Sequence, residues 1–131
     1  MTGRGGLKLE GLMVARAFHA TEPAWALRAY LVLIGCAARH ETVTYEQLAR
    51  RIKRGASNLL AKPLELVTQW CQQNSLPALS SLVVDYATAL PAPGFTGVPW
   101  SEIRHEQERV WQFDWFSIFP PTIEELGENP N

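Results

Sequence analysis

The chain has 131 residues, of which 12 are basic and 13 acidic, so the formal net charge is -1. With 47% hydrophobic and only 19% charged residues, a largely disordered chain is excluded, and the length suits one domain, residues 1–131, that buries its own core. The near-zero net charge conceals an uneven distribution of charge along the chain. Residues 1–62 carry ten basic and four acidic side chains, a net charge of +6, and residues 63–131 carry two and nine, a net charge of -7. The total charge therefore does not exclude a nucleic-acid binder.

No segment of the sequence predicts a membrane span or a secretory signal. The most apolar uncharged stretch, residues 29–38, has ten residues, whereas a spanning helix needs about 20. The N-terminus has two basic residues but no long apolar region behind them. Cys36 and Cys71 fall within apolar helical patterns, so we expect buried thiols in a cytoplasmic protein, with a bridge between them as the alternative.

The first predicted elements are two helices. Apolar residues recur at helical spacing between Leu7 and Ala20, which favours a short N-terminal helix. A second helix has a clearer start signal at Thr21, which can cap exposed backbone N–H groups, while Pro23 fits the first helical turn. This second helix is expected to be largely buried and to end near Arg39.

The strongest local signal is a capping box. Thr44 is followed three residues later by Gln47, which predicts a short helix that buries Leu48 and Ile52 and ends at Gly55. A further helix is expected from about residue 57 or 58 to 74. Because Pro63 is costly inside a helix, either the regular helix begins near residue 62 or its first turn is separate and kinked.

Two short helices joined by a glycine-containing turn, residues 44–74, are typical of a helix-turn-helix. The β-branched residues 82–84, a turn rich in proline and glycine, and a return strand over residues 95–98 would form a wing at about residues 82–98. Beyond it lies an acidic aromatic region, residues 101–126, in which a helix is expected from residue 102 to about 113. Ser101 is its expected cap, Glu102, Glu106 and Glu108 face outward, and a second capping box at residues 122–125 predicts a final short helix. The predicted fold is mainly α with a small β-hairpin, a winged helix-turn-helix with extra N- and C-terminal helices.

Basic residues cluster on the predicted helix pair. Phosphates attract such clusters through counterion release, although charged helix faces are often only solvated. The predicted nucleic-acid site has Arg50, Arg51, Lys53 and Arg54 contacting phosphates, with Tyr45 and Asn58 approaching bases and Lys62 supporting the second helix.

Residues 43–49 (VTYEQLA), the second helix of the pair, residues 74–79 (NSLPAL) and Val83-Val84 together resemble the winged-helix domain of O6-alkylguanine-DNA alkyltransferases and their alkyltransferase-like relatives. The resemblance covers about residues 29–95. It implies DNA binding and a role for Tyr45 in rotating a nucleotide out of the duplex. The alternative for Tyr45 is an aromatic side chain that packs over the hairpin.

The chain departs from that family at the reactive centre. The segment between Pro77 and Val84, where the family carries a Pro-Cys-His-Arg motif, has no cysteine, histidine or arginine. The family's stack-filling arginine would align with Asn58 or Leu59. Without a thiolate to accept an alkyl group, alkyl transfer is excluded. No catalytic set, clustered metal ligands or phosphate-binding loop is evident, so we expect a non-enzyme without metal or cofactor.

The aromatic C-terminal region supports a second hypothesis. Residues 115–119 are aromatic or apolar almost without interruption, beyond what helical periodicity requires, and acidic residues surround them. The chain would then be an interaction module without nucleic-acid contact. Its protein partner or second copy would dock on Trp111, Trp115, Phe116 and Phe119.

Overall fold

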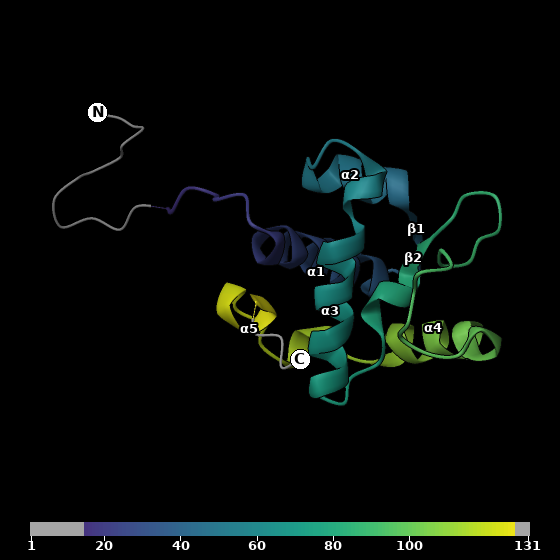
Figure 1. Cartoon of the computed structure of the whole chain (residues 1–131). Helices are drawn as coiled ribbons and strands as arrows, with labels where there is room; N and C mark the ends of the chain where they lie inside the picture. The colour runs from purple at the N-terminus through teal and green to yellow at the C-terminus, as the bar shows by residue number, and fades with distance from the viewer. Residues whose placement is uncertain (1–14, 128–131) are drawn as a thin grey trace, which may run out of the picture.

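The computed structural model describes residues 15–127, and in this range the chain is mainly helical with one small sheet (Figure 1). The α-helices are α1 (Glu22–Ala38), α2 (Tyr45–Ile52), α3 (Ala61–Gln73), α4 (Ile103–Gln112) and α5 (Ile123–Gly127). The strands are β1 (Val43–Thr44) and β2 (Val83–Val84), and short 3-10 turns are η1 (Ser57–Leu59), η2 (Leu79–Leu82), η3 (Trp100–Glu102) and η4 (Trp115–Ser117). The mainly α fold class is confirmed.

α1 begins and ends where the sequence predicts. The hydroxyl of Thr21 accepts a hydrogen bond from the N–H of Ala24 at 3.2 Å, and the helix stops before Arg39. Tyr30 and Leu33 on α1 are fully buried, and α2, α3 and α5 pack against this helix. The core is therefore built around α1, which lies behind α3 in the view of Figure 1.

The predicted N-terminal helix is wrong for residues 15–20, which are not helical; residues 7–14 of that prediction lie outside the described range. Phe18 instead packs edge-on against Trp25 of α1, with ring centroids 4.8 Å apart. The guanidinium of Arg28 lies 3.6 Å from the centre of the Phe18 ring. Contacts with α1 thus hold this segment without a helix of its own.

The small sheet is parallel, so the predicted wing hairpin is wrong. Val43 pairs with Val83 and Thr44 with Val84, and no strand lies within residues 85–99. The expected return strand has Pro91 and Pro93 just before it, and prolines cannot donate ladder hydrogen bonds. β2 pairs with β1 instead, which places the end of η2 beside the start of α2.

The helix predicted from residue 102 to about 113 is present as α4, and the predicted final short helix is present as α5. Residues 100–102 form the η3 turn, no side chain caps α4, and the chain leaves the helix at Phe113. The second capping box is confirmed, because Thr122 and Glu125 exchange two hydrogen bonds of 3.0 Å at the start of α5. Prolines 120 and 121 separate η4 from α5 and prevent a continuous helix.

Glu106 was expected to face solvent but is buried, with 5% of its surface exposed. Its carboxylate accepts hydrogen bonds of 2.7 Å from the N–H of Ala78 and from the guanidinium of Arg109. The neighbouring Gln107 donates to the carbonyl of Ser81 at 2.8 Å. Glu106 and Gln107 of α4 therefore hold the η2 segment in place. They supply hydrogen-bond partners for the N–H of Ala78 and the carbonyl of Ser81, which are buried and need such partners.

Trp115, one of the aromatic residues predicted to dock a partner, belongs to the core with 3% exposure. Its ring packs edge-on against Tyr30, and its indole N–H donates to the carbonyl of Val110 at 2.9 Å. Trp111 is half-buried and donates to the carbonyl of Glu41. Trp115 is therefore unavailable to a partner, and Trp111 is engaged within the chain.

Cys36 and Cys71 are both buried and free, as expected, and the alternative of a bridge does not hold. Burial raises the pKa of the Cys71 thiol to about 12, so it stays protonated at neutral pH. Within residues 15–127, no helix is both long and apolar enough to cross a membrane.

Candidate nucleic-acid interface

α2 and α3 form the predicted helix pair, and the capping box that starts α2 is confirmed. The hydroxyl of Thr44 accepts from the N–H of Gln47 at 3.1 Å, and the Gln47 side chain accepts from the N–H of Thr44 at 3.0 Å. The helix ends before the predicted Gly55, because Lys53 itself adopts a left-handed conformation with φ 66°. The second helix is divided as anticipated: η1 comes first, and α3 begins at residue 61 with Pro63 in its first turn.

Three of the predicted phosphate contacts are exposed around α2. Arg50, Arg51 and Lys53 form no salt bridge with any carboxylate of residues 15–127. Arg50 and Lys53 follow Glu46 at helical spacing, so these three positions share one face of the helix. Arg51 points to another side, where its guanidinium lies 3.8 Å from the sulfur of Cys36. Arg50 and Lys53 therefore supply two unpaired cations, against the one carboxylate of Glu46, on one face of α2.

Arg54, the fourth predicted phosphate contact, and Lys62, the predicted support of the second helix, are paired with carboxylates. Arg54 binds Glu22 through two hydrogen bonds of 3.1 Å, lies 4.9 Å from the Trp25 ring centre, and has a side chain only 12% exposed. It joins the end of α2 to the start of α1, so it is withdrawn from any phosphate. Lys62 lies 3.6 Å from Glu65 with both side chains about half exposed, a weak surface pair that a phosphate can displace.

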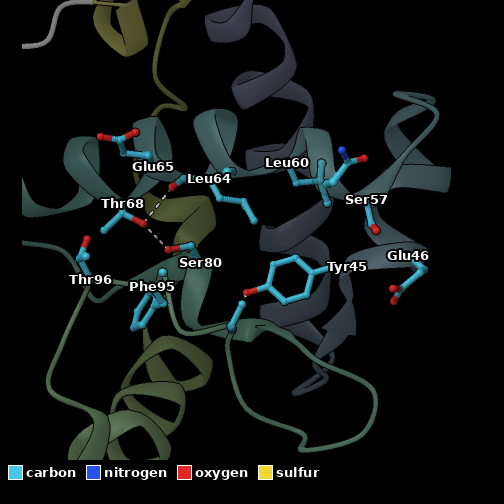
Figure 2. A pocket seen from close by; sticks show the side chains of 14 residues that line it. Tyr45, Glu46, Ser57, Leu60, Leu64, Glu65, Thr68, Ser80, Phe95 and Thr96 are labelled. Atoms are coloured by element: carbon cyan, nitrogen blue, oxygen red, sulfur yellow. Dashed lines mark hydrogen bonds between the residues drawn. The ribbon is translucent and has the colours of Figure 1, made fainter.

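A cavity of about 580 Å³ opens between α2, α3 and the loop of residues 85–99 (Figure 2). Its volume falls within the range of small-molecule sites, about 300–1,000 Å³. Tyr45 and Asn58, the two residues predicted to approach bases, both lie on its wall. It is lined by Tyr45, Glu46, Ser57, Asn58, Leu60, Ala61, Leu64, Glu65, Thr68, Ser80, Ala92, Gly94, Phe95 and Thr96.

Two buried hydroxyl groups meet on the inner wall of the cavity. Thr68 of α3 donates its only hydroxyl proton to the carbonyl of Leu64 at 2.9 Å, so the hydrogen bond between Thr68 and Ser80 must be donated by Ser80 (Figure 2). The oxygen of Ser80 then keeps free lone pairs. This wall can therefore accept a hydrogen bond from a ligand.

Tyr45 supplies the complementary group. Its phenolic oxygen accepts a hydrogen bond of 2.8 Å from the N–H of Ala92, and no acceptor within residues 15–127 takes its own proton. Burial raises the pKa of Tyr45 above its ordinary value, so the phenol stays protonated and can donate at neutral pH. The same contact ties the 85–99 loop to α2, which matches the alternative of a packed tyrosine, although the segment it packs against is a loop rather than a hairpin.

Phe95 closes the cavity from the loop side (Figure 2). Its ring lies so close to Gly97 that a side chain at position 97 would collide with it and would also meet Ala78. The absence of a side chain at Gly97 thus lets the loop fold down over the cavity. Together with Leu60 and Leu64 of α3, Phe95 gives the cavity apolar walls that suit a flat ring.

The sequence did not single out Thr68, Ser80 or Phe95 as site residues. Ser80 enters the site because Glu106 and Gln107 hold η2 beside α3. One signal was present: Thr68 follows Leu64 by one helical turn, so it is a polar residue on a buried face.

The oppositely charged parts of the chain lie apart. In Figure 1, α2 is at the top of the molecule, α4 is at the lower right and α5 is at the left. Among the described residues, no salt bridge joins a cation of α2 to a carboxylate of residues 102–127. The acidic region therefore does not pair with the cations of α2.

In the part of the chain that the structure describes, no group of three or more His, Cys, Asp or Glu side chains is placed to hold a metal ion. Comparisons with protein-family models, curated proteins and solved structures found no match for the chain.

Proposed function

We propose that this chain is a non-catalytic nucleic-acid-binding protein of the winged-helix type, with DNA as the first ligand to test and a regulatory or accessory role. The loop of residues 85–99 takes the place of the wing. The observation that carries the proposal is the pair Arg50 and Lys53, exposed and without a carboxylate partner on the α2 face that borders the cavity. Lysine and arginine in such positions bind phosphates and release counterions.

The cavity extends this proposal to an unpaired base. The resemblance to alkyltransferases implies a nucleotide rotated out of the duplex, and the cavity offers apolar walls, an acceptor on Ser80 and a donor on Tyr45 for such a base. Neither cysteine lines the cavity, so a base would be held without group transfer. Asn58 and Lys62 lie at the α3 end of the same surface and would contact the strand beside it.

The first test is the salt dependence of DNA binding. We expect the full chain to bind duplex DNA at low salt, with log K falling linearly against log salt concentration. Replacing Arg50 or Lys53 with alanine removes one phosphate contact, so each change should lower that slope by about 1. Fluorescence anisotropy over a salt series measures it.

Arg104→Ala is the matched control, because Arg104 is also exposed but belongs to α4 at the other edge of the molecule (Figure 1). It should leave the slope unchanged. If the wild-type chain binds no duplex or single-stranded DNA at low salt, or if Arg104→Ala weakens binding as much as Arg50→Ala, the proposal is wrong.

The second test concerns the base. A duplex with one mispaired base should bind more tightly than the fully paired duplex, because unstacking a mispaired base costs less. Ala61 is exposed on the cavity wall, so Ala61→Trp should fill the mouth and remove this preference without weakening binding to the paired duplex. Equal affinity of the wild-type chain for both duplexes would refute the base site and leave the α2 contacts intact.

A further inference from the structure

Two phenylalanines and three carboxylates are exposed within residues 114–125, and we call this exposed part of the segment the acidic aromatic surface. Phe116 is 68% exposed and Phe119 is 91% exposed. Asp114, Glu124 and Glu125 are exposed beside them in the sequence. Exposing two large aromatic rings within four residues is costly for a soluble domain and is typical of a docking site.

The segment that carries these phenylalanines is held in place from both sides. Asp114 accepts a hydrogen bond of 3.1 Å from the N–H of Phe116, and the buried Trp115 anchors the turn to the core. On the other side, the capping box of Thr122 and Glu125 fixes the start of α5. The rings are therefore presented by an ordered backbone, which lowers the entropy cost of binding.

The charge of this surface selects its occupant. Residues 110–127 contain no lysine, arginine or histidine, and Asp114, Glu124 and Glu125 form no salt bridge with any cation of residues 15–127. A phosphate backbone would be repelled there. A segment with positive side chains around an apolar anchor would gain both the burial of the rings and the attraction of the carboxylates.

We propose that the acidic aromatic surface docks a basic segment of another protein, in which lysine or arginine flanks one or two apolar side chains. The surface adjoins α5, at the left of the molecule in Figure 1, while Arg50 belongs to α2, at the top. A partner on it leaves α2 uncovered. Together with the nucleic-acid contacts of α2, this docking would make the chain an adaptor, a role that rests on the proposed function as well as on this surface.

A random peptide display library, selected on the immobilised full chain, tests this. Selected peptides should be rich in lysine and arginine with at least one large apolar residue. When synthesised, they should bind the double variant Phe116→Ser/Phe119→Ser about tenfold or more weakly than the wild type. Tyr86→Ser is the control, because Tyr86 is 85% exposed on the 85–99 loop, away from this surface, and should not change peptide affinity.

Selection of acidic peptides, of peptides that bind the double variant equally well, or of no peptide at all would overturn the proposal. Sedimentation of the full chain tests whether a second copy of the chain occupies the surface instead. A dimer that dissociates in the double variant would show this. None of these measurements depends on DNA binding, so the two proposals fail independently.

Discussion

Replacing Trp115 with alanine is expected to lower the free energy of unfolding by about 3–5 kcal/mol, because it empties a large site in a packed core. The ring is 3% exposed, packs edge-on against Tyr30 at 6.3 Å and Phe113 at 4.8 Å, and also loses the hydrogen bond to Val110. Urea unfolding followed by circular dichroism measures the effect.

Phe119→Ala is the control for Trp115→Ala. It removes an aromatic ring from the same segment, but one that is 91% exposed, so it should change the free energy of unfolding by less than about 0.5 kcal/mol. If both variants are equally stable, the C-terminal segment does not pack on α1 and the described core is wrong.

Glu106→Gln is expected to destabilise the chain by about 2 kcal/mol, although it keeps the shape of the side chain. The buried carboxylate accepts from two donors, the N–H of Ala78 and the guanidinium of Arg109, and hydrogen bonds to a charged acceptor contribute more than neutral ones. A glutamine must turn its amide N–H₂ toward one of these donors or lose the contact. Thermal and urea unfolding at neutral pH measure the loss.

Glu108→Gln tests whether the effect belongs to this position. Glu108 lies on the same helix but is exposed, so its replacement should stay within about 0.5 kcal/mol of the wild type. Equal stability of both variants would show that Glu106 does not fasten η2. Since η2 carries Ser80, Glu106→Gln should also weaken any binding in the cavity beyond its effect on stability.

The fold does not pair the charges of α2 with those of the C-terminal region. Among the described residues, the basic residues of α2 and the acidic residues of the C-terminal region form no salt bridges with each other. The two hypotheses drawn from the sequence, a nucleic-acid binder and a protein-docking module, therefore concern different surfaces and do not exclude each other.

The sequence by itself determined the starts of three helices. The caps at Thr21, Thr44 and Thr122 depend on residues within one turn of each other, so local hydrogen bonding is enough to specify them. It also placed Leu48 and Ile52 on the buried side of α2, because helical periodicity is a local pattern. The prediction for Tyr45 came instead from the resemblance to the alkyltransferases, in which the family's stack-filling arginine would align near Asn58.

Only the tertiary structure decided which partner each side chain meets. Val83 pairs with Val43, forty residues away, rather than with the residues that follow it, and Glu106 turns inward because η2 needs an acceptor. Likewise Arg54 pairs with Glu22 rather than remaining exposed, and Ser80 and Thr68 become neighbours in one cavity. Such contacts join residues far apart in the chain, and their energies depend on burial and on competing partners that no local pattern records.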